Sequence, residues 1–210
     1  MVLFLMMALM ASAQDLVVCS YNIRNSNRGD DKNGNGWKTR YEYLCQQIEF
    51  EDPGLFGCQE VKKEQLDDMI ARMPEYAYVG VGRDDGKEGG EYSPVFYKKD
   101  RYVLLESGTF WLAEDPTKPV LGWDAACKRV CSWGHFRDKK TKHTFYFFNT
   151  HMDHIGVTAR REGAKLIVSK MRELMKKNDP VILTGDFNVD QTSEPYQVFT
   201  NSGFLKDCYV

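Results

Sequence analysis

Residues 180–189 read PVILTGDFNV and combine a strand-forming run with chemically active side chains. The apolar residues 181–183 favour a buried strand. Asp186 and Asn188 follow closely, so both oxygen-bearing side chains are expected where that strand ends. A buried strand that delivers polar groups at one end is typical of a ligand site at a sheet edge.

Three other strand-like runs end in the same way. Asn22 follows LVVCSY, Glu60 follows LFGCQ, and His151 follows TFYFFNT. A lone Asn or Glu at a strand end is most often a turn former or a solvated carboxylate. Four strands that each deliver a polar residue at one end instead favour convergence on a single pocket.

Helix and strand patterns alternate along the rest of the chain. Apolar residues recur at helical spacing in residues 41–50, 62–73 and 164–175. Five strand-like runs (YAYVGVG, YSPVFY, TFWL, RVCSWGHF and TFYFFN) are separated by turn residues, which predicts antiparallel strands. Together these patterns predict a layered α/β fold, and 210 residues without a linker predict one domain.

Residues 31–42 (DKNGNGWKTRYE) match the spacing of an EF-hand calcium loop. The preceding residues, SYNIRNSNRG, leave a strand-like run and lack the apolar spacing of a helix. Because an EF-hand loop needs a helix on each side, a solvated, Asn-rich loop is the favoured interpretation.

The N-terminus carries an apolar run that is too short to span a bilayer, followed by Ala11-Ser12-Ala13. This pattern predicts a signal peptide over residues 1–13, a mature domain over residues 14–210 and a secreted or periplasmic location. A buried first strand or helix is the alternative. Six cysteines could form disulfides after export, but Cys19 and Cys58 lie in strand-like runs and are expected to pack as small apolar residues.

The formal net charge of -2 gives no long-range attraction to nucleic acid or to an anionic membrane. A polyanionic substrate would therefore be held by local charge or by a metal. The carboxylate and amide oxygens at the strand ends, without clustered thiolates or imidazoles, favour a hard ion, Mg²⁺ or Mn²⁺.

Four segments carry a family resemblance: Ser20-Tyr21-Asn22, Gln59-Glu60, NTHMDH (residues 149–154) and TGDFN (residues 184–188). Their types and order resemble the endonuclease/exonuclease/phosphatase superfamily with its deoxyribonuclease-like fold, and the connecting sequence is similar to that of secreted bacterial members. The resemblance implies a four-layered α/β sandwich of two mixed, mainly antiparallel sheets flanked by helices. It also implies a metal-dependent hydrolase that uses water to cleave a metal-bound phosphate ester.

The resemblance assigns roles by position. Glu60 is implied as the main metal ligand, assisted by Asn22 and Asp186. Asp186 would orient or activate the attacking water, and Asn188 would hold the phosphate. His151 would hydrogen-bond a phosphoryl oxygen and stabilise the transition state. Asn22, Asn188 and His151 are thus also the implied substrate-binding residues.

One departure from the family pattern concerns the C-terminus. Family members continue past GDFN to a Ser-Asp-His segment, but no Ser-Asp-His occurs in this chain. We therefore expect the fold to be incomplete at the C-terminus, with a hydrophobic edge uncovered. We also expect this 210-residue chain to bind metal weakly and to be inactive.

Two alternatives remain open. The stretch His151-Met152-Asp153-His154 is similar to the HxHxDH zinc motif of metallo-β-lactamase-like hydrolases, but position 149 is Asn and the other strand ends would be unused. Within the first family, Asp153 and His154 would support the site, although His154 is equally suited to a structural role. The second alternative is an exported, noncatalytic binding module or relic of the same fold.

The substrate is left open by the sequence. Nucleic acids, phospholipid head groups and small phosphate esters all fit the site type, and we expect a monomer without a transmembrane segment. Loops 24–37, 82–92 and 113–124 are expected to line the pocket mouth. Trp37, Trp111 and Trp123 are candidates for its walls, with packing in the core as the alternative.

Overall fold

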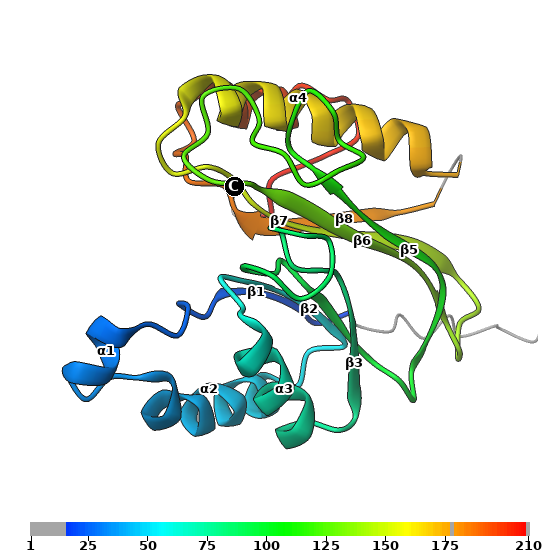
Figure 1. Ribbon diagram of the computed structural model, residues 1–210. Coiled ribbons are helices and arrows are strands. Elements are labelled where there is room, and N and C mark those ends of the chain that lie inside the picture. The colour runs from blue at the N-terminus through cyan, green and yellow to red at the C-terminus, as the bar shows by residue number, and fades with distance from the viewer. Residues whose placement is uncertain (1–15, 177–178, 209–210) are drawn as a thin grey trace, which may run out of the picture.

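The computed structural model describes residues 16–176 and 179–208. The predicted signal peptide lies outside these residues. Within them, two four-stranded sheets pack face to face, and helices cover both outer faces (Figure 1). No helix in this part of the chain is long and apolar enough to cross a membrane.

The first sheet has the strand order β1-β2-β4-β3. Its strands are β1 (Val18–Asn22), β2 (Leu55–Gln59), β3 (Tyr76–Val79) and β4 (Val95–Lys98). The β1/β2 pair is parallel, and the other two pairs are antiparallel. The helices of this half are α1 (Arg28–Lys32), α2 (Trp37–Glu51) and α3 (Lys63–Arg72), which lie on its outer side in Figure 1.

The second sheet has the order β5-β6-β7-β8. Its strands are β5 (Tyr102–Trp111), β6 (Val130–Asp138), β7 (Thr144–His151) and β8 (Val181–Asp186). Only the β7/β8 pair is parallel. The helices of this half are α4 (Val157–Leu174) and α5 (Glu194–Thr200). The predicted sandwich of two mixed, mainly antiparallel sheets with flanking helices is confirmed.

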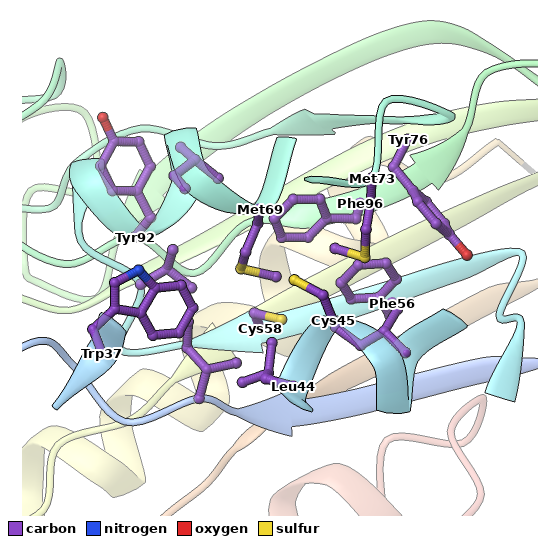
Figure 2. Packing of buried hydrophobic residues seen from close by; sticks show 14 residues of the cluster. Trp37, Leu44, Cys45, Phe56, Cys58, Met69, Met73, Tyr76, Tyr92 and Phe96 are labelled. Atoms are coloured by element: carbon purple, nitrogen blue, oxygen red, sulfur yellow. The ribbon is translucent and has the colours of Figure 1, made fainter. Parts of the chain in front are cut away.

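Helical spacing in the sequence becomes a buried face on each long helix. Leu44, Cys45 and Ile48 of α2 pack with Leu66 and Met69 of α3 against the first sheet. Figure 2 shows the sulfur-containing and aromatic side chains of this cluster packed together. All six cysteines are free thiols, and burial raises the pKa of the Cys45 thiol to about 11.

The contact between the sheets contains a buried polar node centred on Asn149, which is 0% exposed. Its amide donates to the carbonyls of Cys58 (2.7 Å) and Pro94 (2.9 Å), and its side-chain oxygen accepts from Gln59 (2.7 Å) and Thr184 (3.0 Å). A Cβ added at residue 57 would lie 2.4 Å from the Asn149 side chain, so the close approach requires glycine there.

Part of the stretch 31–42, expected to be a solvated loop, is helical, because α1 ends at Lys32 and α2 begins at Trp37. Helix α1 forms just before this stretch because the Asn27 side chain accepts from the backbone of Asp30 (2.9 Å) and caps the first turn. Arg24 donates to the Asp30 carboxylate (2.5 and 2.8 Å), which holds the pKa of that carboxyl at about 2. These side-chain contacts stabilise a helix that lacks apolar spacing.

Candidate active site

The two parallel strand pairs bring the predicted polar residues to one edge of the sandwich. Asn22 ends β1 opposite Gln59, and His151 ends β7 opposite Asp186. Strands β1 and β8 contact each other across the two sheets. Strand ends that are far apart in sequence therefore meet, as the sequence pattern predicted.

The centre of this edge is the Asn22 amide, which donates to two carboxylates. Its nitrogen lies 3.0 Å from Glu60 Oε1 and 2.9 Å from Asp186 Oδ2. The two carboxylate oxygens can therefore be no farther apart than the sum of those distances. Because the amide is neutral, it does not compensate the negative charge of the two carboxylates. A cation beside them is therefore favoured.

Glu60 sits directly after β2 with a left-handed φ of 63°. A non-glycine residue adopts this conformation only when its surroundings impose it. Here Asn25 donates to Glu60 Oε2 from its backbone (2.9 Å) and its side chain (3.2 Å). Burial disfavours the charged carboxylate, but the hydrogen bonds from Asn25 and Asn22 outweigh it and lower the pKa of Glu60.

Asp186 and Asn188 are fixed by the turn that follows β8. The Asn188 backbone, with φ 50°, donates to Asp186 Oδ1 at 3.1 Å. The Asn188 side chain donates to the Met152 carbonyl at 3.0 Å. Asp186 therefore keeps one oxygen on the Asn22 amide and the other on the turn.

His151 lies beside this acidic pair with Nε2 3.8 Å from Asp186 Oδ2. Its Nδ1 is buried and has no hydrogen-bond partner among the described residues. Burial, reinforced by the positive charge of Arg129, lowers the pKa of His151 to about 4, although Asp186 and Glu60 oppose the shift. The imidazole is therefore neutral at neutral pH and retains one N–H to donate.

Asp153, which follows His151 closely in the chain, accepts hydrogen bonds from two separate segments. Its Oδ1 accepts from the backbone of Ile155 (3.0 Å) and Gly156 (2.7 Å), and its Oδ2 accepts from Ala126 (3.2 Å) and Arg129 (3.4 Å). Burial opposes ionisation, but these donors hold the pKa of Asp153 well below its ordinary value. Asp153 therefore ties the end of β7 to the start of β6.

Cys127, Asp153 and His154 form a cluster of potential metal ligands, each offering an atom within 4.8 Å of the others. Arg129 already contacts two of them, through Nε to Asp153 and through Nη2 to His154 Nδ1 (3.0 Å). A guanidinium in that position supplies the positive charge that an ion would bring. The cluster is therefore less suited to a cation than the Asn22 edge.

Several residues that shape the site were not predicted. Asn25 donates to Glu91 Oε1 at 2.9 Å as well as to Glu60, and Glu91 pairs with Arg83 at 2.5 Å. Arg83 and Glu91 belong to the predicted pocket loop 82–92, but nothing in their local sequence marks them. Only the tertiary course of that loop brings them to Glu60.

The three tryptophans occupy different positions. Trp37 is 2% exposed in the core and donates to Asp68 at 2.8 Å, so it is not a pocket wall. Trp111 is also buried and donates to the Arg83 carbonyl at 2.7 Å, which anchors the 82–92 loop. Trp123 is partly exposed in the 113–124 loop.

A pocket of about 440 Å³ adjoins this edge. Its lining residues include Asn22, Asp186 and Asn188, together with Ser20 and Gln59. The pocket thus reaches Asn22 and Asp186, whereas Glu60 and His151 are not among its lining residues. Glu60, Asp186 and the Asn22 side-chain oxygen form an all-oxygen donor set that fits a hard divalent cation, provided that the amide turns from its present contacts.

The fold and this edge define a two-sheet α/β sandwich with an acidic, imidazole-containing site where its parallel strands end. Residues 19–207 match the sequence model of the Endonuclease/Exonuclease/phosphatase family, and the chain belongs to that family. Family members are hydrolases that act on phosphoesters.

Solved structures of similar proteins support this membership. The chain is 52% identical to a mannosyl-6-phosphatase from Bacteroides thetaiotaomicron, with a TM-score of 0.88 over 90% of this chain and 71% of that one. It is 51% identical to an endonuclease/exonuclease/phosphatase family protein from the same organism, with a TM-score of 0.86 over 90% of this chain and 69% of that one.

A curated viral relative is more distant. An uncharacterized protein of Acanthamoeba polyphaga mimivirus is 25% identical over an alignment of 174 residues, and the match covers 68% of this chain. The match spans only 25% of the length of that viral protein.

Proposed function

We propose that this protein is a divalent-metal-dependent phosphoester hydrolase in which water attacks a metal-bound phosphate. The observation that carries the proposal is the Asn22 amide, which joins Glu60 and Asp186 at an edge shared with His151 and Asn188. Glu60, Asn22 and Asp186 would hold Mg²⁺ or Mn²⁺. When bound, the cation would neutralise charge on a phosphoryl oxygen and on the leaving group.

The chain's own residues would divide the remaining work. Asp186 would orient the attacking water and accept its proton, because hydrogen bonds to both of its carboxylate oxygens fix its position. His151 would donate its N–H to a phosphoryl oxygen as negative charge develops there. The Asn188 amide would position the phosphate beside these two groups.

A sugar phosphate is the first substrate to test because the similar Bacteroides protein is a mannosyl-6-phosphatase. Phospholipid head groups and nucleic acids are further candidates for the same site. We further propose that the protein is exported and monomeric.

The test measures phosphate release from a panel of sugar phosphates, with p-nitrophenyl phosphate and bis-p-nitrophenyl phosphate as generic esters. We expect EDTA to abolish release and Mg²⁺ or Mn²⁺ to restore it. The reaction is followed with this chain and with any longer product of the same gene. Absence of metal-dependent release from every chain would favour a noncatalytic binding module.

A further inference from the structure

Two arginines belong to the hydrogen-bond network around the site. Arg129 precedes β6, and Arg83 lies in the loop that connects β3 with β4. Arg129 donates to Asp153 and His154, which follow His151 closely in the chain. Arg83 pairs with Glu91, which shares the Asn25 amide with Glu60.

Arg129 is almost fully enclosed, with 5% of its surface exposed. Its Nε donates to Asp153 at 3.4 Å and its Nη2 to His154 at 3.0 Å. Its Nη1 is buried and finds no partner in the part of the chain that the structure describes. A buried donor left without an acceptor is destabilising, and more so for a charged group, so an incoming acceptor is favoured.

Arg83 is held in a similar way. Its Nη1 pairs with Glu91, while its Nε lies 3.9 Å from Asp84 Oδ1 and is a second buried donor without a hydrogen bond in residues 16–176 and 179–208. The loop around it is fixed, since Trp111 donates to the Arg83 carbonyl and Lys128 donates to the Asp84 carbonyl at 2.8 Å. The side chain keeps 16% of its surface exposed and so lies at the boundary with solvent.

The charges in this network balance, and so do not repel a dianion, only when both arginines are present. Four carboxylates are hydrogen-bonded into the site: Glu60, Asp186, Glu91 and Asp153. A divalent cation together with Arg83 and Arg129 balances them. Without the arginines the same site would carry a net negative charge and repel a phosphate that itself carries two.

We propose that Arg83 and Arg129 bind the non-bridging oxygens of a phosphate monoester beside His151, and thereby select monoesters over diesters. This inference rests on the proposed function, whose substrate class it narrows. A guanidinium presents planar N–H donors that match phosphate oxygens. A monoester offers three such oxygens and a second negative charge, whereas a diester offers two oxygens and one charge.

The test compares the binding of inorganic phosphate and dimethyl phosphate by titration calorimetry at about pH 8, where phosphate is mainly a dianion. The variants are Arg83→Gln, Arg129→Gln and Arg129→Lys, all measured with Mg²⁺ present. Arg137→Gln is the matched control, since Arg137 is exposed at the other end of β6. Thermal unfolding identifies any variant that fails to fold, and Arg83→Gln tests the inference independently of Arg129.

We expect wild-type protein to bind phosphate at least about tenfold more tightly than dimethyl phosphate, and each folded arginine variant to lose about that factor for phosphate alone. Arg137→Gln should bind like wild type. Equal loss for both ligands, no loss, or no phosphate binding by wild type would overturn the inference. Metal-dependent hydrolysis without arginine-dependent discrimination would overturn it while leaving the proposed function intact. Arginine-dependent phosphate binding without hydrolysis of any ester would overturn the proposed function and leave the inference about phosphate binding intact.

Discussion

The acidic and the basic sides of His151 are built in different ways. On the acidic side, Asn22 and Asp186 end β1 and β8, Glu60 follows β2, and the parallel strand pairs bring them together. On the basic side, Arg83 comes from a long loop and Arg129 from a strand start, and both are held by carboxylates. The comparison shows that strand ends supply one half of this site and tertiary contacts the other.

The largest expected effect concerns the acidic side. In a chain with measurable activity, Glu60→Gln and His151→Ala should each lower turnover by at least about 100-fold, because each removes a group that stabilises charge in the transition state. Steady-state kinetics with saturating Mg²⁺ measure this. Glu64→Gln, an exposed carboxylate of α3, serves as the control. Near-normal turnover in either site variant would refute the assignment.

On the basic side the main expected effect is on stability. Asp153→Asn should lower the free energy of unfolding by about 3–5 kcal/mol at neutral pH, because buried donors lose their charged acceptor. The depressed pKa of Asp153 means that its contribution is complete above the unfolded pKa of about 3.9 and is lost as pH falls through the lower folded value.

Urea unfolding at neutral and acidic pH tests this directly. The difference between wild type and Asp153→Asn should shrink as the pH falls below about 4. Asp100→Asn, at an exposed turn, should show no such difference. A gap that stayed constant with pH would show that the loss comes from packing alone.

Asn25 connects the two sides, and its removal should have an intermediate effect on metal binding. Asn25→Ala deletes the amide shared by Glu60 and Glu91 but keeps the backbone donor to Glu60. We expect divalent-cation affinity to fall about 10–100-fold, as is typical when a group that supports a metal ligand is lost. Titration with Mn²⁺ followed by electron paramagnetic resonance measures the affinity, with exposed Asn35→Ala as the control.

The smallest effect is expected outside both sides. The double change Asp31→Ala and Glu42→Gln should leave Mg²⁺-dependent turnover within about twofold, as for most surface substitutions. In the structure Glu42 accepts from Arg72 at 3.2 Å and so links α2 to α3. Abolished turnover would instead support a calcium-type loop at residues 31–42.

The same contrast separates the features that the sequence predicts from those that it does not. Most strands and the positions of Asn22, Glu60, His151, Asp186 and Asn188 at strand ends could be predicted, because strand alternation and strand ends are local patterns. The packing of these strands into two mixed sheets was implied only by the family resemblance. Trp37 could not be placed, since an aromatic residue suits a core and a pocket wall equally well.

Elements that depend on nonlocal contacts were also missed. Helix α5 begins at the local Ser193 cap, but its Phe199 packs into the core of the second half, which its short sequence does not reveal. The first part of β5, before TFWL, has a mixed polar sequence and is a strand because β6 pairs with it. The roles of Asn25, Arg83, Glu91 and Arg129 likewise depend on partners far away in the chain.

The buried Asn149 node has a consequence for how the protein accommodates different substrates. From β7, the Asn149 amide donates to carbonyls of β2 and of the segment before β4. Gly57 allows the two sheets to approach closely at this point. The halves cannot slide or hinge without breaking several enclosed hydrogen bonds at once. The edge that carries the candidate site is therefore held rigidly, and differences in substrate would arise in the surrounding loops.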